Sequence, residues 1–430
     1  MTEVNSTEVK LGWKRGLRRL LSRRLRPVQA WARKRLLLAC DRAVLLSRVN
    51  RRRDTVLLVR LDNIGDFVVW LDAGRAIVAH YRAHGKRVTL LANAVWSSWA
   101  EELGLFDEVL PLEERRFRRN LRYRLQMGRT IRARGFEIAV QPAFTRLLEG
   151  GDSIVHLSGA TQRVGSVGIF ERGAESDRGT SDRWFTQMLS FDPAISSEIG
   201  RNAAFVRALT GTGYRGRVAD LRAGMKLSVP QELRAELESE QYFVLFPGAS
   251  SAARLWPAKR YVELAERVHA ATGWMGVVCG GPSEAAQASA LCRAATIPLL
   301  NWVGRTSLSG LAAVLAHADL LVANETSAVH IAAAVGTPTV CITGGGHYGR
   351  FMPYRVEERD NRPLPVAAVH RMGCFHCDWR CEYHPPKGSP VPCIEQVSVE
   401  DAWAAVEALL GCSHSVTPAA SEAFTVLQCS

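Results

Sequence analysis

The chain has 430 residues, of which 47% are hydrophobic, and it carries a formal net charge of +13. These values exclude a disordered chain and leave room for two domains with full cores. No stretch approaches the roughly 18 to 20 uncharged apolar residues that cross a bilayer, and the arginine-rich first 35 residues lack the apolar core of a secretory signal. We therefore expect a cytoplasmic protein.

The positive charge is concentrated at the N-terminus. Residues 1–53 hold 16 Lys and Arg against three acidic residues, which accounts for the whole net charge. Apolar residues recur at helical spacing from Trp13 to Val28, so one face of this helix is apolar and the rest is basic. We predict a basic amphipathic arm that binds an anionic membrane surface, at about 1 kcal/mol for each basic residue near that surface. The alternatives are a nucleic-acid-binding arm, a transit peptide or a helix packed on the body; we expect no nucleic acid.

From residue 54 the chain alternates strand-like and helix-like segments, a pattern that predicts parallel α/β sheets. Residues 150–225 are rich in Gly, Ser, Arg and Thr and give no clear pattern. The strands expected in the first half are Val56–Val59, Val88–Leu91, Val109–Leu110 and Glu137–Val140.

The stretch "RLDNIGD" follows the first of these strands and leads into an apolar, helix-like segment. This is the start of a βαβ unit, where ligands meet the carboxyl ends of parallel strands. Asp66 is then expected in the first turn of the helix. There it either caps the helix, whose N-terminal end is positive, or faces a ligand.

A second alternating series begins at Gln241. Its expected strands are Tyr242–Phe246, Met275–Cys279, Leu320–Ala323 and Thr339–Thr343, with helices near 258–272, 283–296, 307–317 and 327–335. We therefore predict an α/β protein with two Rossmann-like domains facing a central cleft. The predicted parts are the arm (1–53), an N-terminal domain (54–230), a C-terminal domain (231–412) and a tail (413–430).

Three segments at expected strand ends in the second half carry ligand signals. "FPGASSAARLWP" supplies a turn at Gly248, the hydroxyls of Ser250 and Ser251, and the cation Arg254. "VCGGPSE" places Glu284 in the first turn of a helix.

The third segment, "VANETSAVHIAAAVGTP", has a turn at Glu325–Ser327 before a helix of small residues. The free N–H groups and positive dipole end of such a helix suit a diphosphate. Together the segments predict a nucleotide diphosphate site with Arg254 on the phosphates and Glu284 or Glu325 on the ribose hydroxyls.

"RLDNIGD", "PGASSAARLWPAKRYVELA", "GGPSE" and "NETSAVHIAAAVGTPTV" resemble, in that order, the motifs of glycosyltransferase family 9, the lipopolysaccharide heptosyltransferases. The resemblance covers residues 54 to about 410. It implies a GT-B fold, an acceptor in the N-terminal half, ADP-heptose in the C-terminal half, and transfer that inverts the anomeric centre. In the family the aspartate of the "GD" step is the catalytic base, which here is Asp66.

The resemblance also implies a donor site that needs no divalent metal. Two departures matter: Arg254 stands in place of the usual Lys, and "ETS" stands in place of the commonest "DTG". His330 has an alternative role in packing or in positioning its helix. By position in the motifs, the donor-binding residues are Ser250, Arg254, Glu284, Thr306, Glu325, Thr326, Ser327 and His330.

The acceptor expected from the resemblance is a lipid-linked saccharide, and the expected location is the cytoplasmic face of the inner membrane, where the protein is peripheral. Two other hypotheses stay open. One is a related sugar-nucleotide enzyme with another donor, a protein acceptor or another reaction such as epimerisation. The other is a non-enzymatic binding module that uses the basic arm.

Four cysteines follow the second series, with the spacing C-x2-C-x3-C-x11-C. Four thiolates in a reducing compartment are suited to hold Zn²⁺ or iron in a tetrahedral site that pins a loop. Some family relatives have an iron site of four cysteines near this part of the chain, with a different spacing. Reduced thiols or a disulfide are the alternatives. The candidate ligands are Cys374, Cys377, Cys381 and Cys393.

Overall fold

The computed structural model describes residues 29–50, 52–170, 173–225, 227–238 and 241–414. By their contacts these residues form two compact units. The first unit holds the described residues up to Asn63, together with Ala76–Phe191 and Phe205–Thr212. The second unit holds Ile64–Arg75, Asp192–Ala204 and the described residues from Gly213 onward.

The first unit is built on a parallel sheet in the order β3-β2-β1-β4-β6-β8. Each residue of β1, "TVLLVR", is buried, as expected for a strand covered on both faces. The order reverses between β1 and β4, and "RLDNIGD" overlaps and follows the end of β1. The strands are β1 (Thr55–Arg60), β2 (Arg87–Asn93), β3 (Glu108–Leu112), β4 (Ile138–Gln141), β6 (Gln162–Ser166) and β8 (Gln187–Leu189).

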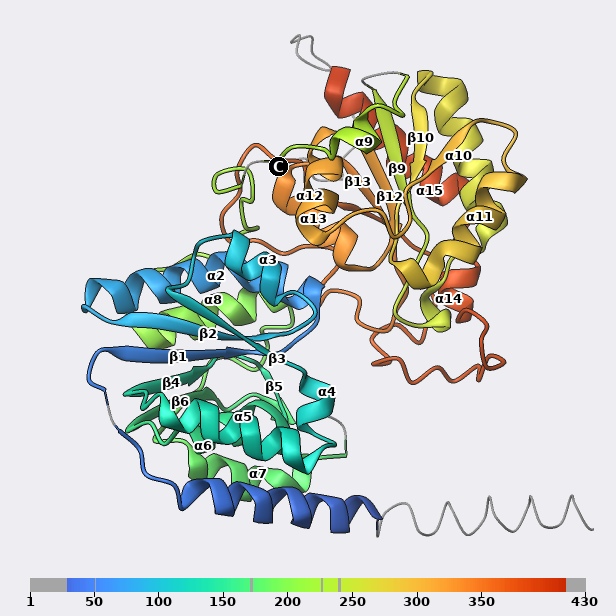
Figure 1. Ribbon diagram of the computed structural model, residues 1–430. Helices are drawn as coiled ribbons and strands as arrows, with labels where there is room; N and C mark the ends of the chain where they lie inside the picture. The colour runs from blue at the N-terminus through green and yellow to red at the C-terminus, as the bar shows by residue number, and fades with distance from the viewer. Residues whose placement is uncertain (1–28, 51, 171–172, 226, 239–240, 415–430) are drawn as a thin grey trace, which may run out of the picture. The chain divides into compact units, whose positions relative to one another are not determined.

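Helices cover both faces of this sheet, with α5 and α6 on one face and α2 on the other (Figure 1). Asn120 caps α5, because its side chain accepts from Tyr123 N at 2.9 Å. The helices in this part of the chain are α2 (Ile64–Ala83), α3 (Ser97–Glu102), α4 (Glu114–Phe117), α5 (Leu121–Ala133), α6 (Ser153–Ser158), α7 (Arg178–Ser181) and α8 (Glu198–Thr210).

Residues 29–45 of the predicted arm form a helix that packs on the first unit. Leu37 and Val44 are buried, and Asp41 receives two bonds of 2.6 Å from the guanidinium of Arg124. For this half of the arm the structure matches the alternative of a helix packed on the body. The Trp13–Val28 face lies outside the described residues.

The second unit is built on a parallel sheet in the order β11-β10-β9-β12-β13-β14. Its strand order reverses between β9 and β12. The strands are β9 (Tyr242–Phe246), β10 (Met275–Val278), β11 (Leu299–Asn301), β12 (Leu320–Asn324), β13 (Thr339–Ile342) and β14 (Val366–Ala368).

Helices α10, α11 and α15 lie on one face of this sheet, and α12 and α13 lie on the other (Figure 1). Gly273 (φ 72°) and Gly336 (φ 80°) end α10 and α13 in the left-handed conformation that favours glycine. The helices of this part are α9 (Gln231–Arg234), α10 (Ala258–Thr272), α11 (Ala285–Ala294), α12 (Leu308–His317), α13 (Ser327–Val335), α14 (Pro392–Glu395) and α15 (Val399–His414).

The prediction of two Rossmann-like α/β domains is confirmed, and each expected strand is present with ends no more than two residues from those expected. The sequence pattern did not predict β6, β8, β11 and β14. β6 reads "QRVGS", and the other three strands have only three residues each. Among the described residues we find no helix with both the length and the apolarity to cross a bilayer.

Candidate functional site

The loops at the carboxyl ends of β9 and β12 stand where the strand order of the second sheet reverses. Ligands of open parallel sheets bind outside the strand ends at such a point. Gly248–Arg254 follow β9 and Glu325–Ser327 follow β12. Asn324, fully buried, joins the two loops: its Nδ2 donates to Pro247 O at 2.7 Å, and its Oδ1 accepts from Trp256 N at 3.1 Å. Most predicted donor residues therefore share one edge of the sheet.

Arg254 is the cation of the loop after β9. It ends the short helical turn Ala252–Arg254, which Ser251 caps by accepting from Ala253 N at 3.3 Å. The guanidinium of Arg254 lies 4.2 Å from the ring centroid of Trp379, and it forms no ion pair with any residue that the structure describes. An arginine held by an aromatic ring keeps its N–H groups for an anion.

Glu284 closes the turn after β10. Its carboxylate accepts from Gly281 N at 2.8 Å and lies over Gly248 and Gly280, where a Cβ would overlap it. Burial raises the pKa of Glu284, and the Gly281 N–H opposes this shift. The structure therefore brings Gly248 and Glu284 together, while the side chain of Ser250 is exposed.

The start of α13 forms a third side of this edge. Thr326 precedes the helix, and its buried Oγ1 has no hydrogen-bond partner among the described residues. Glu325 accepts from Thr343 Oγ1 at 2.5 Å; burial raises the pKa of Glu325, and the Thr343 bond and the charge of Arg254 oppose that shift. Because the first N–H groups of a helix lack intrahelical partners, this helix start, which begins at Ser327, suits an anion.

His330 lies near the start of α13 and is buried. Its Nδ1 shares a 2.5 Å hydrogen bond with Tyr354 Oη, and the two rings stack with centroids 5.7 Å apart. Burial lowers the pKa of His330 to about 4, so its imidazole is neutral at pH 7. It therefore offers no positive charge to a diphosphate, which favours the packing alternative.

Thr306 lies on a different loop, the one after β11. It is half-buried and precedes Ser307, whose Oγ accepts from Gly310 N at 3.1 Å and caps α12. The neighbouring Arg305 pairs with Glu236 at 2.5 Å. Within the described ranges Thr306 has no hydrogen bond to another predicted donor residue.

Asp66 lies in the first turn of α2, as predicted, and is half-buried. The other aspartate of the motif, Asp62, pairs with the buried Arg60 at 2.8 Å. By its contacts the first half of α2 groups with the second unit, and a Cβ on Gly65 would lie 2.9 Å from Cδ2 of His330. Glycine is therefore needed before Asp66, because the first turn of α2 packs on α13.

The four cysteines are free thiols that line one pocket: Cys374, Cys377, Cys381 and Cys393. Burial raises the pKa of Cys393, the Gly345 N–H opposes this shift, and the other three thiols add to it. In the part of the chain that the structure describes, no three His, Cys, Asp or Glu side chains are gathered so as to hold a metal ion. The cysteines thus share a pocket, and the metal stays a prediction.

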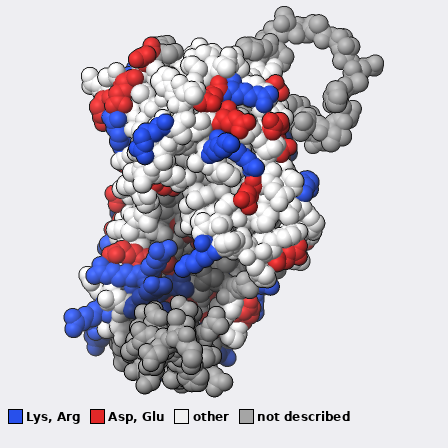
Figure 2. All heavy atoms as spheres, turned by 90° about the vertical axis from the view of Figure 1, so that its right-hand side faces the viewer, with Lys and Arg blue, Asp and Glu red and all other residues white. Residues whose placement is uncertain are grey.

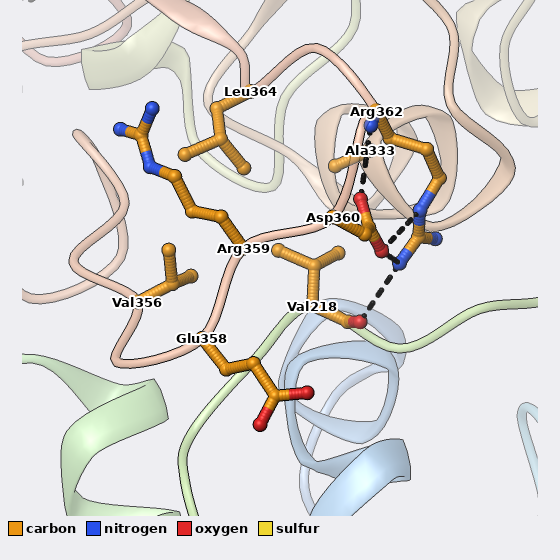
Figure 3. A pocket seen from close by; sticks show the side chains of 8 residues that line it. All are labelled: Val218, Ala333, Val356, Glu358, Arg359, Asp360, Arg362 and Leu364. Carbon is orange, nitrogen blue, oxygen red and sulfur yellow. Dashed lines mark hydrogen bonds and ion pairs between the residues drawn. The ribbon is translucent and has the colours of Figure 1, made fainter. Parts of the chain in front are cut away.

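A second pocket is lined by residues near the C-terminal end of α13 (Figure 3). Arg362 donates there to the carbonyls of Val218 at 3.0 Å and Ala334 at 2.8 Å, and it pairs with Asp360. These bonds use its N–H groups and place a positive charge at the negative end of α13. Arg362 is therefore a structural cation.

The sequence pattern did not predict a role for Gly344–Gly346, which follow β13, or for the aromatic side chains that cover them. A Cβ on Gly345 would overlap Phe375, and a Cβ on Gly346 would overlap Trp379. Three glycines directly after a strand indicate a close approach, which is a signal that the sequence does contain. The identity of the covering rings depends on the fold.

The fold defines an α/β protein of the GT-B class. A family 9 glycosyltransferase from Veillonella parvula matches with a TM-score of 0.61 and 16% identity, over 83% of this chain and 97% of that one. Escherichia coli ADP-heptose lipopolysaccharide heptosyltransferase II matches with a TM-score of 0.59 and 16% identity, over 84% of this chain and 100% of that one. At such identities the likeness establishes the fold.

Residues 181–370 match the model of glycosyltransferase family 9 (heptosyltransferase). Lipopolysaccharide heptosyltransferase 1 of Pseudomonas aeruginosa is 35% identical over 120 residues, which are 25% of this chain and 32% of that protein. The chain thus spans about a third of the length of this curated relative. The predicted resemblance to this family is confirmed over these residues.

Proposed function

We propose that the chain is an inverting glycosyltransferase that moves a heptose from ADP-heptose to a lipopolysaccharide core-type saccharide. The observation that carries the proposal is the edge of the second sheet where its strand order reverses. At this edge Arg254 has no ion pair among the described residues, and its positive charge opposes the rise in the pKa of Glu325. Thr326, the next residue, has a buried hydroxyl with no hydrogen-bond partner among the described residues. ADP-heptose is the donor in the name of the E. coli structural relative.

In the proposed reaction the acceptor hydroxyl attacks the anomeric carbon from the face opposite the diphosphate. The bond from that carbon to the phosphate oxygen breaks, and the configuration inverts. Asp66 takes the proton of the attacking hydroxyl. Arg254 and the first N–H groups of α13 stabilise the negative charge of the departing ADP, while Glu284 or Glu325 accepts from the ribose hydroxyls.

A panel of nucleotides tests the donor. A ligand at 100 times its dissociation constant raises the free energy of unfolding by about 2.7 kcal/mol. ADP and ADP-heptose are expected to raise the melting temperature, and UDP- and GDP-sugars are not. Stabilisation by a UDP- or GDP-sugar alone would favour the alternative of a family enzyme with another donor. Assays of heptose transfer to a lipopolysaccharide core acceptor and to protein then separate the two acceptor classes.

A lipid-linked acceptor places the protein at the anionic cytoplasmic face of the inner membrane, where we propose that residues 1–53 bind as a peripheral anchor. Exposed apolar residues of the described arm, Trp31 (59% exposed) and Leu36 (57%), support this. On the face shown in Figure 2, Lys and Arg gather near the bottom. Exposed arginines of the arm helix and of α4 and α5 include Arg33, Arg35, Arg42, Arg115, Arg116, Arg122 and Arg129.

The test of this anchor removes residues 1–28 and spares the helix whose Asp41 pairs with Arg124. Sedimentation with anionic liposomes is expected to weaken in this variant and to weaken again in Trp31→Ser/Leu36→Ser, most clearly at low salt. Activity on a soluble acceptor is expected to stay. Unchanged sedimentation in both variants would remove the membrane from the proposal.

A structural Zn²⁺ or iron bound by the four cysteines remains part of the proposal, and its role is to pin the loop. The shared pocket supports it. Metal analysis of the purified protein tests it, with Cys377→Ser expected to lower the bound metal. A wild-type protein free of both metals would leave reduced thiols as the explanation.

A further inference from the structure

The loop that carries the cysteines, residues 374–393, is bound to the backbone of the glycine triplet Gly344–Gly346. His376 N donates to Gly345 O at 2.7 Å, and Asp378 N donates to Gly346 O at 3.0 Å. At the other end of the loop, Cys393 Sγ accepts from Gly345 N at 3.4 Å. This cysteine loop is therefore built onto the segment that leaves β13, next to the switch-point strand β12.

The cysteine loop has an unusual backbone where it meets the triplet. His376 (φ 69°), Asp378 (φ 51°) and Trp379 (φ 58°) all adopt the left-handed region, which is uncommon for residues other than glycine. Such conformations persist only where the surroundings hold them. Here the Asp378 carboxylate and His347 Nε2 share a hydrogen bond of 2.9 Å, and the rings of His347 and Trp379 form a T-shaped contact with centroids 5.9 Å apart.

This left-handed backbone conformation determines where the Trp379 ring lies. The indole packs on Gly346, where any Cβ would overlap it, and it lies 4.2 Å below the guanidinium carbon of Arg254. Its Nε1 is buried and has no hydrogen-bond partner among the described residues. The loop therefore places its tryptophan against the arginine, without gaining a hydrogen bond for the indole N–H.

We propose that Trp379 is a positioning residue that holds Arg254 for the diphosphate of the donor, so that the cysteine loop sets the affinity for the donor. This inference rests on the proposed function, because it needs Arg254 to bind the phosphates. It also explains why arginine stands where the family motif usually has lysine. A planar guanidinium stacks on an indole and keeps its forked N–H groups directed outward for phosphate oxygens.

A double-mutant cycle on the full chain tests the inference, with ADP binding measured by calorimetry. Trp379→Leu is expected to weaken ADP binding about 3- to 30-fold, the range of a partly desolvated cation–π contact. Trp379→Phe keeps a ring and should retain most of the affinity. In the Arg254→Ala background, Trp379→Leu should add less than about 2-fold, because the two side chains then share one contribution.

Tyr348→Leu is the matched control. Its ring carries another arginine, Arg371, at 4.9 Å, and it packs on Phe375 of the same cysteine loop at 5.2 Å. ADP binding is expected to stay within about 2-fold of wild type, since an exposed contact that does not reach the ligand contributes little. Melting temperatures of all variants report whether the loop remains folded.

The outcomes separate this inference from the proposed function. If Arg254→Ala weakens ADP binding while Trp379→Leu does not, the inference is wrong and the phosphate site stands. The inference is also wrong if Trp379→Leu has its full effect without Arg254, or if Tyr348→Leu weakens binding equally. If Arg254→Ala leaves ADP binding unchanged, the placement of the diphosphate in the proposed function fails as well.

Discussion

Arg124 and Arg146 of the first unit are held differently from Arg254 of the second unit, and the difference separates structural cations from an available one. In the first unit Arg124 is fully buried, with Asp41 on two of its nitrogens and Ser153 on one. Arg146 is 1% exposed and pairs with Asp152 and Asp182. These carboxylates use the N–H groups, so the pairs hold the fold and cannot take a ligand.

In the second unit Arg254 is held by an indole ring and has no ion pair among the described residues. The ring fixes the guanidinium plane and leaves the N–H groups available. Burial together with a carboxylate partner thus marks Arg124 and Arg146 as structural, whereas Arg254, half-buried on a ring and without an ion pair among the described residues, is available for binding.

The largest expected effect is on turnover, in Asp66→Asn. Loss of a general base lowers turnover by about 10² to 10⁴, and the free energy of unfolding is expected to change by less than about 1 kcal/mol, as for a half-buried site. Heptose transfer and urea unfolding are measured side by side. Asp62→Asn, which loses the pair with Arg60, is the control and is expected to affect stability more than turnover. Near-normal turnover in Asp66→Asn would reduce this residue to a helix cap.

Substitution of a structural arginine is expected to lower the free energy of unfolding, in contrast to Asp66→Asn, which lowers turnover. Arg124→Ala leaves the buried Asp41 without its ion-pair partner, with the Ser153 hydroxyl at 2.9 Å as its remaining donor, and costs about 3 to 5 kcal/mol of unfolding free energy. The measurement is the urea transition of the first unit, and the exposed Arg122→Ala on the same helix is the control, expected within about 0.5 kcal/mol of wild type. A loss below about 1 kcal/mol in Arg124→Ala would show that Asp41 is solvated or paired elsewhere.

Much of the fold was predictable because buried parallel strands consist of continuous runs of apolar residues. "TVLLVR" and "YFVLF" are buried at every position, and the structure has strands at both. The start of α13 was also predictable, since the turn before it and the small residues within it are adjacent in the sequence. β6, "QRVGS", was missed because its strand character comes from its neighbours β4 and β8 and not from its own side chains.

The contacts that set the properties of the candidate site were not predictable, because they join residues far apart in the chain. Trp379 meets Arg254 across more than a hundred residues, and Asp41 meets Arg124 across 83. The neutral state of His330 follows from burial, which no local pattern reports. The sequence therefore indicates which residues can bind or react, and the fold determines which of those side chains are already used in structural contacts.

His330 is a buried group that is neutral at pH 7, in contrast to the buried charged arginines. Its folded-state pKa of about 4 lies below the ordinary value of 6.5, so on acidification the unfolded chain takes the proton first. The stability is therefore full above about pH 6.5 and declines as the pH falls toward 4, by about 2 kcal/mol at pH 5. Urea midpoints at pH 7 and pH 5 measure this loss. His330→Gln is expected to lack this share of the decline; an equal decline in both proteins would contradict the burial of a neutral imidazole.

The smallest expected effect is the most specific to the ring-held arginine. Arg254→Lys keeps the positive charge and loses the planar fork, so ADP binding is expected to weaken about 5-fold, which is about 1 kcal/mol. The matched control is Arg267→Lys, because the exposed Arg267 also stacks on a tryptophan, Trp403, at 4.5 Å. That substitution should leave ADP binding unchanged, since no predicted donor residue lies on α10 or α15. If Arg254→Lys binds ADP as tightly as wild type, charge alone is enough at this position, and the distinction between ring-held and carboxylate-held arginines says nothing about phosphate recognition.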